Sequence, residues 1–504
     1  MAASGKVLIG IDLGTTVLKA AGFDAGSGRM LAQASKRLPV ATSREGKREQ
    51  SVADLDKALA AILGRLRRDL GGRWKAVAGI GIAAQGGSTI IADRETGAAL
   101  TPMILWNDRR AFSHQMEIAG RMPASFWRDV GMQDMPGAGL GRMSWLKDTH
   151  SGLFTESNIY AGAGEYLYFR LTGVWRQDAG NALQIGCYNA ARQCLDERPL
   201  ALVEVPVSFV APMRQDHTTC ELSDSAQRAF GLPGGIPAAG PYMDHEAGFM
   251  SASAVSTKPL QCSLGTAWVG NFILPEDTAG RSPFQLVLPA PFGSGRLVVQ
   301  PLLTGNVTWD WGLENLVGRD HRKALISADG IFADELLPPF GLVAIPWNTQ
   351  ANPAAAGAIG GGTFFGVSAH TERAHLLRAL AAGMAYELLR ILEEVKLSGE
   401  VDCVVLGGGA SRGRFFRKLI AALFSPLEVF TLADEDMAGT RGVLYAFDRK
   451  TSQARAVRVR PPAGGVCKRV MEGYRLYLEV FNRLYRQIGI GGAFTFTGEK
   501  EKRG

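Results

Sequence analysis

Two short turns in the sequence carry residue types suited to binding a polyphosphate. The first lies in IDLGTT (residues 11–16) and the second in SLGTA (residues 263–267). Glycine lets backbone N–H groups approach an anion, successive N–H groups form an anion-binding nest, and the threonine hydroxyls add donors. Asp12 directly precedes the first turn and is placed to hold Mg²⁺, which uses one or two carboxylates together with substrate phosphates. Either turn alone is more simply an ordinary hairpin, so the prediction rests on their recurrence.

A carboxylate that suits proton transfer is Asp244, in GPYMDHEAGFM (residues 240–250). It follows a Gly/Pro-rich stretch, GLPGGIPAAG (231–240), which is typical of a connector or a domain boundary. A carboxylate at such a place can accept the proton of a substrate hydroxyl. Asp is also a frequent helix cap, so that interpretation stays open for Asp244.

The elements that must position these residues recur in the two halves of the chain. In each half an apolar strand reaches Leu-Gly-Thr and turns back into a second strand, and a later strand runs into glycines. Helices with apolar residues at three-to-four spacing complete the pattern. We expect strands in 7–11, 17–23, 77–87, 260–264, 267–274 and 401–409, and helices in 51–70 (with Ser51 as N-cap), 371–395 and 467–488.

Length and composition exclude several classes of protein. A domain usually has ~100–200 residues, so 504 residues predict two large domains, and a hydrophobic share of 46% excludes a disordered chain. The net charge of +7 is spread along the chain, which predicts no nucleic-acid partner. No stretch approaches the ~18 apolar residues of a membrane span, and the six cysteines are scattered. We therefore expect no membrane partner, reduced thiols and a cytoplasmic location.

Six motifs, in this order, resemble those of the FGGY family of carbohydrate kinases, and the resemblance covers nearly the whole chain. They are similar to the family's first phosphate motif, substrate segment, catalytic-aspartate block, second phosphate motif, C-terminal signature and adenosine motif. The corresponding segments are GIDLGTTVLKA (10–20), ILWNDRRA (104–111), GPYMDHEAG (240–248), SLGTAW (263–268), FFGVSAHTERAHLLRAL (364–380) and LGGGASRGRFFRKLIAALF (406–424).

The resemblance implies an α/β fold of two actin-like (ribonuclease H-like) domains with a cleft between them. It places a sugar-binding N-terminal domain at 1–243, an ATP-binding C-terminal domain at 244–490 and a tail at 491–504. The implied reaction is transfer of the γ-phosphate of ATP, with Mg²⁺, to a hydroxyl of a small-molecule sugar such as a pentulose. A homodimer is plausible, because closed dimers are common.

The same resemblance assigns residues to roles. Asp244 would be the general base, and Asp12 would help to place Mg²⁺. The nucleotide and its phosphates would contact Gly14, Thr15, Thr16, Lys19, Gly265, Thr266, Gly408 and Gly409. The sugar would contact Gln85, Trp106, Asn107, Asp108, Arg109 and Asp244. Lys19 is equally well explained as a surface lysine on a strand.

Two departures from the family pattern concern the acceptor. After Gln85, relatives that phosphorylate xylulose tend to carry Met-His and those that phosphorylate glycerol Arg-Glu, whereas this chain has Gly86 and Gly87. The pocket is therefore expected to be roomier, or filled by another residue. The segment IPWNTQANPAAAGAI (345–359) lacks the Gly-Glu-Arg-x-Pro of many relatives. A polyol kinase, or a non-catalytic actin-like ATPase on the same fold, remain the alternative functions.

Overall fold

The computed structural model describes residues 5–276, 285–302, 304–348 and 361–487. The chain divides into two compact units. The first comprises residues 1–254, 273–299 and 437–455, and the second comprises residues 255–272, 300–436 and 456–504. The expected tail and most of the 345–359 segment lie outside the described residues.

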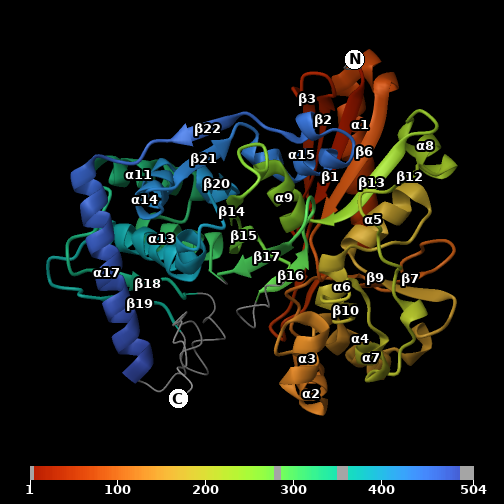
Figure 1. The fold of residues 1–504 in the computed structure, drawn as a ribbon, viewed down its shortest axis with the longest axis horizontal. Helices are drawn as coiled ribbons and strands as arrows, with labels where there is room; N and C mark the ends of the chain where they lie inside the picture. The colour runs from red at the N-terminus through yellow and green to blue at the C-terminus, as the bar shows by residue number, and fades with distance from the viewer. Residues whose placement is uncertain (1–4, 277–284, 303, 349–360, 488–504) are drawn as a thin grey trace. The chain divides into compact units, whose positions relative to one another are not determined.

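The first unit contains a mixed sheet, which helix α1 (Val52–Leu70) accompanies in Figure 1. Its strand order is β12-β13-β6-β1-β2-β3, in which β1, β6 and β13 are mutually parallel and β2, β3 and β12 run against their neighbours. The strands are β1 (Val7–Leu13), β2 (Val17–Asp24), β3 (Met30–Arg37), β6 (Val77–Ala84), β12 (Thr219–Glu221) and β13 (Pro237–Met243).

One face of this sheet is covered by helix α1 (Val52–Leu70), as its apolar stripe predicts. The Ser51 hydroxyl accepts a hydrogen bond from Asp54 N at 3.3 Å, which confirms Ser51 as the N-cap. Leu59 and Leu66 are among the residues that the helix buries in the core. Each such leucine stabilises the fold by roughly 1.5–3 kcal/mol, so the helix is held by packing more than by propensity.

The other face is lined by glycines where the segment 437–455 returns to the first unit. A Cβ on Gly10 of β1 would overlap the Thr440 carbonyl oxygen of α15 (Ala438–Gly442). A Cβ on Gly81 of β6 would lie 2.6 Å from Val443 Cγ2. Glycine at these two positions permits the close approach of the segment 437–455 to the sheet.

The second unit contains the strand order β15-β14-β20-β21-β22. Strands β14, β20 and β21 are parallel, and β15 and β22 are antiparallel to their neighbours. The elements are β14 (Pro259–Leu264), β15 (Trp268–Leu274), β20 (Cys403–Gly407), β21 (Glu428–Leu432), β22 (Ala456–Val459), α13 (Arg373–Leu397), α14 (Arg414–Leu423) and α17 (Gly464–Gln487). The long helices expected in this half are therefore confirmed.

The two halves repeat one topology, as the recurring Leu-Gly-Thr turns indicate. In each unit the strand before the turn pairs antiparallel with the strand after it and parallel with a later strand that ends in a glycine-containing turn. That later strand follows a long helix, α1 in one unit and α13 in the other. The weak sequence echo thus marks a repeated supersecondary unit.

The expected connector over 231–240 is wrong in its second half. Pro237–Met243 form β13, which pairs with both β6 and β12. The small residues Ala238, Ala239 and Gly240 resemble a linker in composition, but they are buried where the sheet packs closely against its surroundings. Composition alone did not distinguish a tightly packed strand from a loop.

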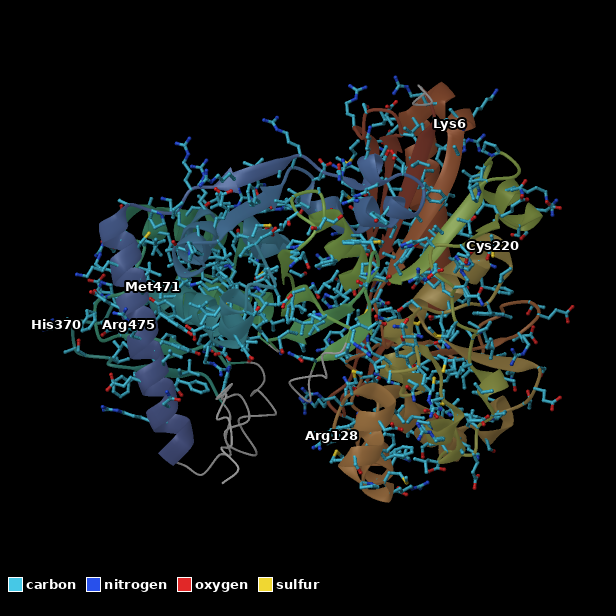
Figure 2. All side chains as sticks on the ribbon, in the orientation of Figure 1. Lys6, Arg128, Cys220, His370, Met471 and Arg475 are labelled. Atoms are coloured by element: carbon cyan, nitrogen blue, oxygen red, sulfur yellow. The ribbon has the colours of Figure 1, made fainter. Side chains whose placement is uncertain are left out.

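Two further expectations concern cysteines and membranes. All six cysteines are free, including Cys220 on β12, which is labelled in Figure 2. Among the described residues, no helix is both long and apolar enough to cross a bilayer.

The glycine face of the first sheet gives a testable prediction. Gly10→Ala places a methyl group on the Thr440 backbone, which cannot move like a side-chain tip, so the substitution is expected to destabilise the first unit by about 1–3 kcal/mol. Gly72→Ala is the matched control, because nothing lies within 4 Å of its added Cβ. Thermal unfolding should show a lower melting temperature for Gly10→Ala alone, and equal melting temperatures would contradict the packing argument.

Candidate active site

Three polar residues lie at the carboxyl ends of the three parallel strands of the first unit. Asp12 is near the end of β1, Gln85 directly follows β6, and Asp244 directly follows β13. The carboxyl ends of neighbouring parallel strands lie at one edge of a sheet, which is where α/β folds commonly bind ligands. Gln85 N donates to Leu13 O at 2.8 Å, which extends the ladder to this edge. The sheet thereby brings together residues more than 200 positions apart.

The electrostatics of Asp12 show how crowded this edge is. Burial raises the pKa of Asp12 to about 6, Lys19, its partner on β2, opposes this rise, and the Asp244 carboxylate adds to it. Gly439 packs against the carboxylate, because a Cβ there would lie 2.5 Å from Asp12 Oδ2. A buried carboxylate next to a second carboxylate favours a bound cation.

The first Leu-Gly-Thr turn is held by contacts on both sides. Gly14 N donates to Val17 O at 3.1 Å, which closes the turn. The buried Gln50 side chain donates to Thr15 O at 2.7 Å, and Trp106 Nε1 donates to Thr15 Oγ1 at 3.1 Å. Thr16 is exposed. The turn therefore has a fixed backbone and an accessible hydroxyl.

Asp244 is the first residue of α9 (Asp244–Ala252), and the N-cap position belongs to Met243. Its Oδ1 accepts a hydrogen bond from His245 N at 2.9 Å. Its Oδ2 has no hydrogen-bond partner among the described residues. A simple capping role would use a bond further along the helix, so the free oxygen leaves Asp244 able to accept a proton.

The Trp106–Arg109 segment divides into exposed and engaged residues. Trp106 is 41% exposed, and Arg109 is exposed as well. The Asp108 carboxylate accepts hydrogen bonds from Arg48 N at 2.7 Å and from the Arg110 guanidinium at 2.7 and 3.1 Å. Burial would raise the pKa of Asp108, but these hydrogen bonds hold it below its usual value. Asp108 thus fixes the segment, and its expected contact with the sugar stays a prediction.

Arg142 was not found by sequence reasoning. It lies on α4 (Ala138–Thr149), is buried, and donates to Gly87 O, to Thr89 Oγ1 at 3.3 Å and to Trp106 O at 2.7 Å. It therefore joins the loop after β6 to the Trp106 segment. An arginine in an otherwise uncharged run, GAGLGRMSW (137–145), was the available signal.

Several polar atoms near these elements have no protein partner. They are both amide atoms of Gln85, Asn107 Oδ1 and Asn181 Nδ2, and all are buried. Buried polar groups in folded proteins are nearly always hydrogen-bonded to protein, water or ligand. A ligand rich in hydroxyl groups suits them, because a hydroxyl both donates and accepts.

The space beside Gly86 and Gly87 is filled by Gln184. A Cβ on Gly86 would overlap Gln184 Nε2, and one on Gly87 would overlap Gln184 Oε1. Gly87 also has a φ of 71°, which favours glycine. Of the two expectations for the missing side chains, a roomier pocket or another residue in their place, the structure shows the second.

In the second unit the two glycine motifs contact each other. Gly408 has a φ of 87°, and a Cβ there would lie 2.6 Å from the Leu264 carbonyl carbon and 2.9 Å from Gly265 N. Asn306, which the sequence did not suggest, donates from its backbone to Gly265 O at 3.1 Å and lies beside Gly409. Gly265 has no contact closer than 3.7 Å to an added Cβ, and Thr266 is exposed. The turn at Gly265 is thus supported by contacts with Gly408 and Asn306, and its Thr266 is accessible to solvent.

The described residues contain no group of three or more side chains that together suit a metal ion. Mg²⁺ does not require one, since it keeps waters and shares phosphate ligands with one or two carboxylates. The paired carboxylates Asp12 and Asp244 fit this requirement.

The repeated strand topology and the glycine turns define an actin-like, two-domain ATPase fold, and known proteins agree. The chain superimposes with a TM-score of 0.80 on the crystal structure of a xylulose kinase from Rhodospirillum rubrum, at 20% identity over 96% of this chain and 100% of that one. It is 22% identical to a xylulose kinase of Bacillus subtilis, with 88% of each chain covered. A glycerol kinase of Trichormus variabilis is also 22% identical, over 86% of this chain and 88% of the relative.

Both halves match one family. Residues 7–251 match the N-terminal domain and residues 260–446 the C-terminal domain of the FGGY family of carbohydrate kinases. The chain belongs to this family, which confirms the resemblance, the fold class and the assignment as an ATP-dependent sugar kinase.

The raised pKa of Asp12 predicts how stability depends on pH. The folded state binds the Asp12 proton more tightly than the unfolded state, so this group stabilises the fold below about pH 4 and that stability is lost as the pH rises through about 6. Asp12→Asn removes the ionisation and is expected to stabilise the first unit at pH 8 by about 1–3 kcal/mol. Melting temperatures at pH 5 and pH 8 measure this difference.

The control is Asp24→Asn at the other end of the same hairpin. Hydrogen bonds from the Ser27 side chain and backbone lower the pKa of Asp24, so its loss should not stabilise the fold at pH 8. If Asp12→Asn changes the melting temperature at pH 8 in the same way as Asp24→Asn, burial of the Asp12 carboxylate does not destabilise the fold.

Proposed function

We propose that this chain transfers the γ-phosphate of ATP to a hydroxyl of a ketose such as a pentulose, with Asp244 as the general base. The observation that carries this proposal is the free Oδ2 of Asp244 at the strand edge that also presents the unpartnered amide of Gln85. A base beside polar atoms that lack partners is what binding and deprotonation of a sugar require. The family gives the reaction class, and the geometry of the site supports the proposed roles.

In the proposed reaction the first unit, within residues 1–243 and Asp244, binds the acceptor. Gln85, Asn107 and Arg109 hydrogen-bond its hydroxyls, and the exposed Trp106 ring covers its apolar face. Asp108 contributes by holding the segment in place and, as expected from the resemblance, borders the sugar. Asp244 accepts the proton of the attacking hydroxyl as its oxygen forms the new bond to the γ-phosphorus, and ADP leaves with the electrons of the broken P–O bond.

The nucleotide is proposed to lie mainly on residues 244–490. The residues proposed to contact it are Gly265, Thr266, Gly408 and Gly409. Gly408 packs on the Leu264–Gly265 backbone, an added Cβ on Gly265 would meet nothing closer than 3.7 Å, and Thr266 is exposed. Gly14, Thr15, Thr16 and Lys19 of the first unit would contact its phosphates. Asp12 would hold Mg²⁺, which neutralises phosphate charge during transfer. A cytoplasmic homodimer completes the proposal.

A polyol kinase is the second candidate, because relatives named glycerol kinase match the chain as broadly as the xylulose kinase does. This chain has Gly86 and Gly87, with Gln184 in the space beside them, where xylulose kinases tend to carry Met-His and glycerol kinases Arg-Glu. A panel of ketoses, deoxy sugars, glycerol and longer polyols distinguishes the candidates by the acceptor with the highest kcat/KM.

The test of the base is the loss of acceptor-dependent ADP release in Asp244→Asn. This substitution keeps the shape of the side chain, and we expect kcat for the best acceptor to fall by about 10²–10⁴-fold. Asp224→Asn is the matched control, since Asp224 occupies the first turn of α8 (Asp224–Phe230) in the same unit and is exposed.

Mass spectrometry of the phosphorylated sugar distinguishes transfer from hydrolysis of ATP. Turnover of Asp244→Asn at the parent rate would remove Asp244 as the base. Release of ADP with no phosphorylated acceptor in the whole panel would favour an actin-like ATPase that does not phosphorylate a sugar.

A further inference from the structure

We propose that the side-chain amide of Gln184 is a specificity-determining contact to the acceptor sugar. This inference rests on the proposed function and assigns a residue that belongs to none of the six motifs. Gln184 lies on α6 (Ala179–Ile185), far along the chain from Gly86 and Gly87. Its amide selects acceptors that present a second hydroxyl group beyond the one that is phosphorylated.

The position of the amide is fixed by what it touches. It covers Gly86 and Gly87, which directly follow Gln85. Its Nε2 lies 3.9 Å from the sulfur of Met243, which directly precedes Asp244. The amide therefore lies beside residues adjacent in sequence to both the proposed base and a proposed acceptor contact.

Helix α6 is anchored against this loop independently of Gln184. Asp178 caps the helix by accepting from Asn181 N at 3.0 Å, and Asn181 Oδ1 accepts from Gly87 N at 3.1 Å. Gly137 packs closely against the Gln184 carbonyl oxygen. Because the backbone is held at these points, the amide is presented by a rigid element and not by a loose loop.

The hydrogen-bonding capacity of the amide is not used by the protein. Gln184 is half-buried, and its weak contact to the Met243 sulfur is its only side-chain hydrogen bond among the described residues. Its Oε1 has no protein partner there. The atoms of nearby Gln85 and the Asn181 Nδ2 also lack partners. A hydroxyl that donates to Oε1 and accepts from Nε2 would satisfy the amide.

The paired glycines are explained by the same contact. A side chain at position 86 or 87 would occupy the place of the amide, so the glycines and Gln184 form one arrangement. Chains with larger residues after the equivalent of Gln85 would contact the acceptor through side chains of that loop. In this chain the proposed contact comes from Gln184 on α6.

The test uses Gln184→Met, which keeps the length and volume of the side chain but removes its hydrogen-bonding atoms. The full-length enzyme is assayed with its best ketose and with deoxy analogues that each lack one hydroxyl. We expect kcat/KM for the ketose to fall about 10- to 100-fold, and kcat/KM for one particular deoxy analogue to change little. The KM for ATP should stay the same.

A second variant approaches the contact from the opposite side. Gly86→Ala displaces the amide, so it should reduce the same discrimination between the ketose and that deoxy analogue. In the Gln184→Met background, Gly86→Ala should reduce discrimination no further, because the contact is already lost.

The outcomes separate the two proposals. If the parent enzyme phosphorylates the ketose and Gln184→Met lowers kcat/KM equally for every acceptor, or not at all, Gln184 is structural and this inference fails alone. If Gly86→Ala leaves the discrimination intact, the inference fails as well. If the parent enzyme phosphorylates no acceptor, the proposed function fails, and the specificity role fails with it.

Discussion

The parallel pairing of β1, β6 and β13 is the constraint on which the site of the first unit depends. Parallel strands place their carboxyl ends at one edge, so the register of these three strands decides that Asp12, Gln85 and Asp244 lie there. A shift of one residue in any strand would turn its side chains to the other face. Both faces of β1 and β6 are buried, and a shifted register would place a side chain where Gly10 and Gly81 admit Thr440 and Val443, so close packing opposes such a shift. The hydrophobic core thus fixes the geometry of the polar edge.

The polar groups at this edge of the sheet lower the stability of the fold. Asp12 is held where burial and a second carboxylate both disfavour its charge, and Lys19 compensates only in part. Buried amides without partners add to this cost. Groups in this state are satisfied by a cation and a polyhydroxylated ligand better than by the protein itself. In the proposed function, binding of the cation and the acceptor would relieve the cost of these unsatisfied groups.

How much the sequence predicts depends on whether the signal is local. Periodicity located α1 with its Ser51 cap, and the Leu-Gly-Thr turns marked a repeated unit, because both are written in short stretches. Residues 237–240 were misinterpreted, since Ala, Gly and Pro are typical of loops and also of strands in close contact. Arg142 and Asn306 were missed because their roles arise from hydrogen bonds to segments remote in sequence. Roles that depend on a neighbour in space need the fold before they can be read.

Gly86 and Gly87 also show that the sequence does not predict contacts between remote segments. The sequence shows only that two side chains are missing at a place where the acceptor is expected. In the structure the Gln184 amide occupies the space that side chains at positions 86 and 87 would fill, and it carries its own hydrogen-bonding groups. In the proposed arrangement, a side chain from a helix takes the place of one from the loop and would contact a different hydroxyl, while Asp244 and the strand edge stay unchanged. If the two proposed roles hold, specificity can vary in this fold without disturbing the parallel strands that precede Asp244, because the proposed specificity residue and the proposed base belong to different elements, α6 and the start of α9.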